Sequence, residues 1–100
     1  MTSNSVQLAA KGEGRCTVIG AVTLETAAAL WQQLKTGGLL GTAREADLSG
    51  VTDADSAGLA LLVAWRGHCL ATGGSLAFQG LPQRMMALAQ LTSAEAALGA

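Results

Sequence analysis

The chain has few charged residues, few aromatic residues and few cysteines, and each shortage excludes a class of function. Only 13% of the residues are charged, against about 25% in an average protein. The six basic residues are scattered and the net charge is -1, so the basic patch that nucleic-acid binding requires is missing. One Phe, two Trp and no Tyr leave few platforms on which bases could stack. We therefore expect no nucleic-acid partner.

Cysteine, histidine and long apolar runs are equally sparse. Cys16 and Cys69 lie far apart and His68 is the single histidine, too few ligands for a metal site. We expect two buried thiols that pack as small apolar side chains, with no cofactor. No apolar run reaches the roughly 18 residues of a membrane span. The first ten residues lack the basic and apolar regions of a signal peptide, which indicates a cytoplasmic protein without direct membrane insertion.

What the chain has in abundance is apolar sequence, at 50% of its residues. Its length predicts one domain, residues 1–100. A small domain with so little charge must leave apolar surface in water or cover it with a partner. The composition therefore favours a protein that spends much of its time bound to another.

Periodicity divides the chain into alternating strands and helices. The predicted elements, in chain order, are strands at Val6–Ala9 and Arg15–Gly20, a helix capped by Thr23 and ended by Gly37, a strand at Arg44–Leu48, a helix at Ser56–Ala71, a strand at Ser75–Gln79, and a helix after Pro82. The order β-β-α-β-α-β-α predicts an α/β fold, an α+β mixed sheet with helices packed on it.

The most informative stretch is Asp47–Leu62, which we interpret as a strand end, a short polar loop, and a helix beginning at Ser56. A helix N-terminus stabilises an oxygen-bearing side chain or a phosphate. Ser56 is thus either a simple N-cap or a hydroxyl that a partner contacts or modifies. Asp53 and Asp55 have no nucleophile, base or metal set at workable spacing, so we expect no catalysis.

The helix at Ser56–Ala71 is apolar on both sides. We expect one stripe to face the sheet, formed by Leu59, Leu62, Val63, Cys69 and Leu70. The other side then carries Ala57, Ala60, Leu61, Ala64, Trp65 and His68. Either another helix covers that side, or it is a docking face with Trp65 as the anchor, since tryptophan is enriched at binding hot spots.

The motif residues resemble a known family. Asp47-Leu48-Ser49-Gly50-Val51, Asp55-Ser56, Gly58-Leu59 and the later Gly80-Leu81-Pro82 are similar to the STAS domain family, which shares the fold of the anti-sigma-factor antagonists. Ala29-Leu30-Trp31, Asp55–Leu62 and Leu76–Gly80 resemble its MlaB-type subunits. This resemblance implies a non-catalytic subunit at the cytoplasmic side of the inner membrane. Such a subunit binds and supports an MlaF-like ATPase of an ABC transporter, together with a membrane permease, in moving phospholipids to maintain outer-membrane lipid asymmetry.

The polar loop and the second apolar side of the helix together predict the partner-binding residues, which are Thr52, Asp55, Ser56, Ala57, Leu61, Trp65 and His68. The resemblance adds an alternative function. Ser56 matches the position that is phosphorylated in the sigma-regulating relatives, so the alternative is an anti-sigma-factor antagonist switched at Ser56. A phosphate there would be favoured by the helix end and repelled by Asp53 and Asp55. A nucleotide-binding module is not supported, because no glycine-rich phosphate loop is present.

Overall fold

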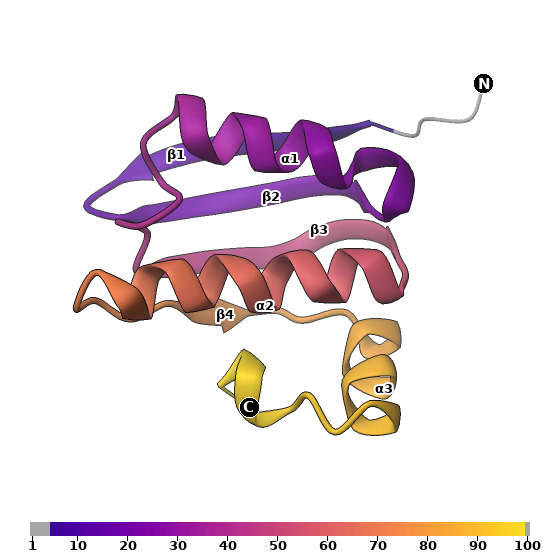
Figure 1. The fold of residues 1–100 in the computed structure, drawn as a ribbon. Coiled ribbons are helices and arrows are strands. Elements are labelled where there is room, and N and C mark those ends of the chain that lie inside the picture. Colours follow the sequence, from indigo (N-terminus) through magenta and orange to yellow (C-terminus); the bar gives the residue numbers. More distant parts are fainter. Residues whose placement is uncertain (1–4, 100) are drawn as a thin grey trace.

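The computed structural model describes residues 5–99 and shows the predicted order of elements (Figure 1). The expectation that the first residues form no signal peptide concerns in part residues 1–4, which lie outside the described residues. The elements are β1 (Val6–Gly12), β2 (Arg15–Val22), α1 (Leu24–Thr36), β3 (Glu45–Ala54), α2 (Ser56–Ala71), β4 (Ala77–Gln79), α3 (Gln83–Leu91) and a final 3-10 turn, η1 (Ala96–Leu98). The predicted fold class is confirmed. Within residues 5–99, no helix is long and apolar enough to cross a membrane.

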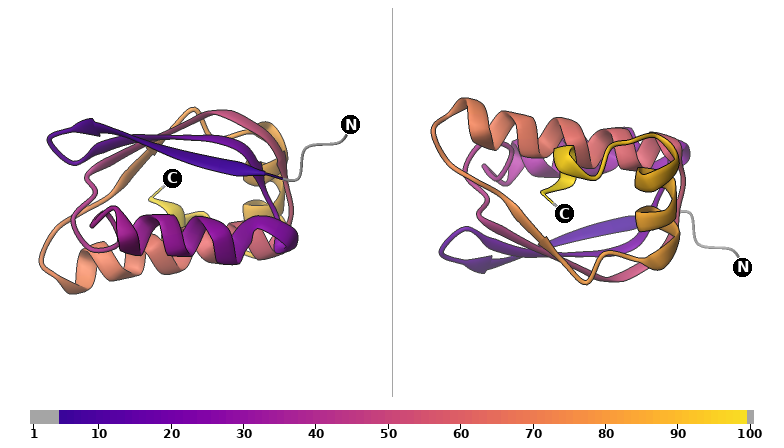
Figure 2. Two further views of the ribbon diagram at one scale, coloured as in Figure 1. Left: turned by 90° about the horizontal axis from the view of Figure 1, so that it is seen from above. Right: turned by 90° about the horizontal axis from the view of Figure 1, so that it is seen from below.

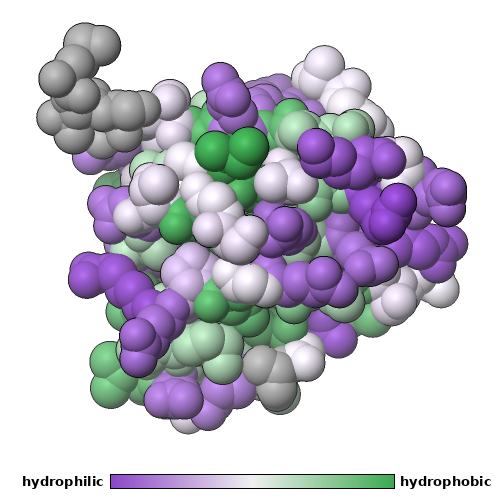
Figure 3. All heavy atoms as spheres, turned by 180° about the vertical axis from the view of Figure 1, so that it is seen from behind, coloured by the Kyte–Doolittle hydropathy of each residue, from purple (hydrophilic) through white to green (hydrophobic). Residues whose placement is uncertain are grey.

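The sheet has the order β1-β2-β3-β4. β1 and β2 form an antiparallel hairpin, whereas β2–β3 and β3–β4 are parallel pairs joined by α1 and α2. Both crossover helices lie side by side on one face of the sheet, and none of the helices formed by residues 5–99 covers the other face (Figure 2). That open face is mainly hydrophilic with a few small apolar spots (Figure 3). The core therefore lies in the single layer between sheet and helices.

The predicted polar loop before α2 is wrong, because β3 continues to Ala54. The parallel ladder with β2 extends past Leu48, pairing Gly50 with Ile19 and Ala54 with Val22 across two irregularities in the register. Ser49 and Asp53 are exposed while Leu48 and Ala54 are buried, so the polar residues lie on the solvent side of a strand. Asp55 alone separates β3 from α2.

Close packing fixes where α2 begins. A Cβ added to Gly58 would lie 1.9 Å from the carbonyl oxygen of Val22, at the end of β2. Only a residue without a side chain permits this approach of helix backbone to strand backbone. Gly58 thereby sets the height of the α2 N-terminus above the sheet.

The two thiols are buried and free, as predicted. Burial, with a smaller contribution from Cys69, raises the pKa of Cys16 to about 11. Burial also raises the pKa of Cys69. Both side chains therefore stay protonated at neutral pH and pack as small apolar groups.

Candidate docking surface on helix α2

Asp55 caps two helices at once. Its Oδ1 accepts a hydrogen bond from the Gly58 N–H in the first turn of α2 (2.9 Å), and its Oδ2 accepts one from the Leu24 N–H at the start of α1 (3.0 Å). The bonds from Leu24 and Gly58 hold the pKa of the Asp55 carboxyl below its usual value. Asp55 therefore ties the N-termini of α1 and α2 together at one end of the molecule.

Ser56 is the first residue of α2 and is exposed. Its interpretation as the N-cap is wrong, because the Asp55 carboxylate takes that position. Among residues 5–99, no group forms a hydrogen bond with the Ser56 hydroxyl, which leaves it accessible to solvent. Arg84 lies close by: its Nε donates to the carbonyl oxygen of Ala54 (2.7 Å), and its charge contributes to the low pKa of Asp55.

An apolar groove separates the outer sides of α1 and α2, with a volume of about 440 Å³. It is lined by Ala27, Ala28, Trp31 and Gln32 from α1, and by Ala57, Ala60, Leu61 and Ala64 from α2. We call it the α1–α2 groove. Leu24, 75% exposed, lies at the end of α1 that Asp55 holds beside α2.

A second apolar groove, of about 360 Å³, lies on the opposite side of α2 and extends to Thr92 and Ala94. We call it the α2–α3 groove. Ala60 and Ala64 line both grooves and are exposed, so they form a low ridge between two hollows. Small side chains on the ridge permit close approach of a partner.

The charge of α2 is directed away from this ridge. Arg66 donates from Nε to the carbonyl oxygen of Leu76 (3.1 Å) and from Nη1 to that of Ala97 (3.4 Å), so its guanidinium lies between the residue before β4 and η1. His68 is exposed and makes a T-shaped contact with the Trp31 ring, with ring centroids 5.2 Å apart and an interplanar angle of 73°. This pair bridges α1 and α2 toward the C-terminal half of both helices.

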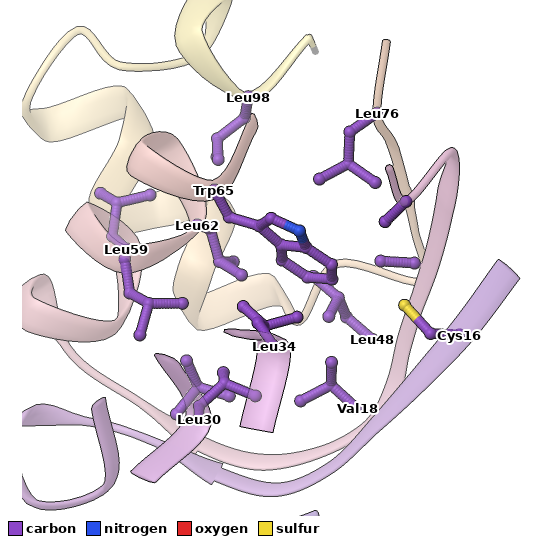
Figure 4. Close-up of a cluster of buried hydrophobic side chains, with 14 of the residues drawn as sticks. Cys16, Val18, Leu30, Leu34, Leu48, Leu59, Leu62, Trp65, Leu76 and Leu98 are labelled. Carbon is purple, nitrogen blue, oxygen red and sulfur yellow. The ribbon is translucent and has the colours of Figure 1, made fainter. Parts of the chain in front are cut away.

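Trp65 does not belong to the docking face, which corrects the sequence-based prediction. Its side chain is 0% exposed and points into the layer between α2 and the sheet, toward Leu48 and Leu62 (Figure 4). The indole Nε1 donates to the carbonyl oxygen of Leu39 (3.0 Å), and the ring lies 5.8 Å from that of Phe78. A side chain so enclosed holds α2 to the sheet and offers nothing to a partner.

Trp31 is half-buried and lines the α1–α2 groove, so Trp31 rather than Trp65 is the tryptophan that borders this surface. Leu61 is 7% exposed and forms the floor of the same groove. The prediction that Leu70 faces the sheet is also wrong, since 47% of it is exposed.

The structure brings together only some of the predicted site residues. Ala57 and Leu61 line the α1–α2 groove, and Ser56 lines the α2–α3 groove. Asp55 joins the N-termini of α1 and α2 at one end of these grooves. Thr52 is exposed near the end of β3 and lines neither groove. Residues 5–99 contain no group of three or more His, Cys, Asp or Glu side chains placed to hold a metal ion.

The model of the MlaB-type STAS domain family matches residues 6–99. The chain belongs to this family. The STAS fold is also that of the anti-sigma factor antagonist SpoIIAA in its unphosphorylated form. The two structures superpose with a TM-score of 0.64 at 14% identity, over 86% of this chain and 82% of the other. At that identity the likeness shows the fold alone.

A weaker structural similarity is to Mglu in its native form, with a TM-score of 0.47 and 19% identity. It covers 75% of this chain but only 22% of the Mglu chain, and no argument rests on it. No curated protein matches the chain significantly.

Sequence reasoning missed the α1 wall of the α1–α2 groove. A signal was present: Ala27, Ala28 and Trp31 extend the apolar stripe of α1 beyond the width that Leu30 and Leu34 need to reach the core. The exposure of Leu24 could not be predicted from the pattern of apolar residues, because it results from the position of Leu24 in the first turn of α1.

Proposed function

We propose that this chain is a non-catalytic STAS subunit that binds the cytoplasmic ATPase of a phospholipid-transporting ABC transporter and supports its assembly. The family membership supports this class of partner, and the ridge of α2 supports the choice of this surface. The ATPase in turn associates with a membrane permease, which brings this subunit to the inner membrane. The transported lipids maintain the asymmetry of the outer membrane.

One observation carries the proposal: α2 exposes a charge-free ridge between two apolar grooves. Surface helices normally carry polar residues on their outer side. Here Ala60 and Ala64 occupy the middle of the outer side of α2, and the Arg66 side chain turns away from it to bond the Leu76 carbonyl oxygen. The grooves on both sides would accept apolar side chains of a partner, with Ser56 and Asp55 as a polar rim at one end.

The test begins with affinity purification of the tagged chain from detergent-solubilised native membranes, with mass spectrometry of the recovered proteins and of Ser56. We expect an ABC ATPase and its permease. The affinity of the purified ATPase is then measured for Ala64→Arg and for Ala87→Arg. Ala64 lies on the ridge, whereas Ala87 is also an exposed alanine but lies on α3 outside both grooves.

Ala64→Arg should weaken binding by roughly tenfold or more, because a long charged side chain on the ridge blocks close contact and must be desolvated. Ala87→Arg should bind like the wild type. Equal affinities for both variants would remove the ridge from the interface, and failure of the wild-type chain to bind any ABC ATPase would refute the proposed function.

A second candidate, a phosphorylation switch at Ser56, is favoured by the free and exposed hydroxyl at the start of α2. A phosphate there would approach helix N–H groups and Arg84, against repulsion from Asp53 and Asp55. The same mass spectrum tests it: a phosphorylated Ser56 with a recovered soluble serine kinase would support this switch, and an unmodified Ser56 in the ATPase complex would refute it.

A further inference from the structure

A hydrogen bond and a ring contact join α1 to α2, one toward each end of the α1–α2 groove. At the N-terminal end, the Leu24 N–H donates to the Asp55 carboxylate (3.0 Å). At the other end, the ring of Trp31 contacts that of His68, with centroids 5.2 Å apart. Between these contacts the two walls of the groove face each other mainly with alanines, which are Ala27 and Ala28 on α1 and Ala57, Ala60 and Ala64 on α2.

The first turn of α1 is fixed to the sheet and to α2 by different bonds. The Thr26 hydroxyl donates to the Ala21 carbonyl oxygen (2.7 Å), which fixes this turn to the end of β2. The Leu24 side chain is 75% exposed, so it adds little packing there. The bond from the Leu24 N–H to Asp55 is therefore what fixes the first turn sideways, at a set distance from α2.

Asp55 is itself held in a fixed place. Its Oδ1 accepts from the Gly58 N–H (2.9 Å), and the close approach of Gly58 to Val22 fixes the start of α2 over β2. Arg84 of α3 holds the preceding residue by a bond to the Ala54 carbonyl oxygen (2.7 Å). Asp55 thus transfers the fixed position of the α2 N-terminus to the N-terminus of α1.

The distance between the two walls matters for a partner in the α1–α2 groove. A side chain seated there touches both walls, and a gap of about 0.5–1 Å on one side loses roughly a quarter to a half of each dispersion contact. Short alanine side chains cannot extend to close such a gap. The affinity of the groove should therefore depend on the bond between Asp55 and Leu24, although neither residue lines the groove.

We propose that Asp55 is a positioning residue for ATPase binding: by holding the Leu24 N–H it fixes the distance between the α1 wall and the α2 wall of the α1–α2 groove. This inference rests on the proposed function and deepens it. It makes the α1 wall a part of the binding surface whose position is controlled from the start of α2.

The test breaks the same bond from its two ends. Asp55→Ser keeps one oxygen that caps α2 but lacks the second oxygen that reaches Leu24. Leu24→Pro removes the N–H at the first position of α1, where proline suits a helix. The preceding Thr23 is already extended (φ −137°, ψ 178°), as a residue before proline must be. Leu24→Ala is the matched control, because it removes the exposed side chain and keeps the N–H.

Affinity for the purified ATPase is measured for each variant. Asp55→Ser should bind roughly three- to tenfold more weakly than the wild type, and Leu24→Pro should bind more weakly than Leu24→Ala by a similar factor. The double variant Asp55→Ser/Leu24→Pro should be within about twofold of the weaker single variant, because both remove one bond. Thermal melts check that each variant folds, and either variant tests the bond if the other does not fold.

Two further measurements separate positioning from a general loss of stability. The Leu24 bond is the largest cause of the low pKa of Asp55, so ¹³C NMR should find a higher Asp55 pKa in Leu24→Pro than in Leu24→Ala. The effect of Asp55→Ser on affinity should nearly vanish in an Ala28→Arg background, where the α1 wall is already blocked. It should persist in a Thr92→Arg background, because Thr92 lines the α2–α3 groove.

Each contrary outcome has a definite meaning. Weaker binding by Asp55→Ser, with Leu24→Pro equal to Leu24→Ala, would make Asp55 a direct contact of the ATPase and overturn the positioning role. Additive losses in the double variant, or equal losses in the Ala28→Arg and Thr92→Arg backgrounds, would also overturn it. Unchanged affinity in both Asp55→Ser and Leu24→Pro would overturn it and leave the proposed function intact. Absence of ATPase binding by the wild type would refute the proposed function itself.

Discussion

Substitution of Gly58 by alanine should strongly destabilise the fold, although alanine is the better helix former. The added Cβ would lie 1.9 Å from the Val22 carbonyl oxygen and 2.7 Å from its carbonyl carbon. Ordinary contacts begin near 3.4 Å, so α2 and β2 would have to separate by about 1.5 Å. Both partners are backbone atoms, and the Val22 side chain is 0% exposed. No flexible side chain is therefore available to move aside.

The magnitude follows from two opposing effects. Alanine gains about 1 kcal/mol over glycine in a helix interior, whereas overpacking a buried contact costs typically 1–3 kcal/mol and more against backbone. Taking the upper end of that cost, because the clash is with backbone atoms, we expect a net loss of about 2 kcal/mol in the free energy of unfolding. For a domain of this size, that lowers Tm on the order of 8–16 °C.

Gly67 is a matched control on the same helix. A Cβ added there meets no atom within 4 Å, so Gly67→Ala should stabilise the protein by about 0.5–1 kcal/mol. Thermal and urea unfolding monitored by circular dichroism measure both variants. Shifts of opposite sign are expected. If Gly58→Ala melts at or above the wild-type temperature, the close approach of α2 to β2 is wrong.

Three further results are expected. Trp65→Ala should lose about 3–5 kcal/mol of stability in urea unfolding, because it empties a buried site; a loss under 1 kcal/mol would contradict the buried position. Trp31→Phe should leave a fluorescence that acrylamide hardly quenches, since only the enclosed Trp65 remains. Asp55→Ala should cost about 2 kcal/mol through its two caps, whereas Asp55→Asn should cost about 1 kcal/mol, because its amide keeps one acceptor oxygen and turns its NH2 donor toward the other N–H. The pKa of Asp55 is lower in the folded protein than in the unfolded chain, where it is near 4. The charged carboxylate therefore stabilises the fold above about pH 4, and this contribution should disappear as the pH falls through the folded pKa. An Asp55→Asn protein with the same acid unfolding curve as the wild type would refute this.

The sequence predicted the elements well because periodicity and end signals agreed. Thr23 preceded α1 and Gly37 followed it, and Pro82 preceded α3, as expected from local chemistry. The strand past Leu48 was missed because Ser49, Gly50 and Asp53 are typical of loops, and only pairing with β2 makes them a strand. That pairing is a long-range contact that no local pattern encodes.

The position of Trp65 was missed for a different reason. α2 is apolar on nearly every side, so periodicity alone does not select the buried face. Gly58 identifies the buried face, because its close contact with Val22 requires it to face β2. Leu62, Trp65 and Cys69 lie on the same stripe of the helix as Gly58 and are buried with it. The face of α2 that packs on the sheet is therefore the one whose side-chain sizes fit the core, and hydrophobicity alone does not distinguish it from the other faces.

This choice of face also determines the shape of the surface that we propose for docking. Trp65 and Leu62 fill the layer over the sheet, and the exposed positions along the middle of α2 carry the small residues Ala60, Ala64 and Gly67. A partner helix can approach such a side closely, since the distance between packed helix axes depends on the side chains at the contact. The surface should therefore tolerate removal of a methyl group far better than addition of bulk. Ala64→Gly, with its modest loss of helix propensity, should keep ATPase binding near the wild-type level, whereas Ala64→Leu should weaken binding although leucine is the more apolar residue. Tighter binding by Ala64→Leu would indicate that hydrophobicity, and not close approach, governs the contact.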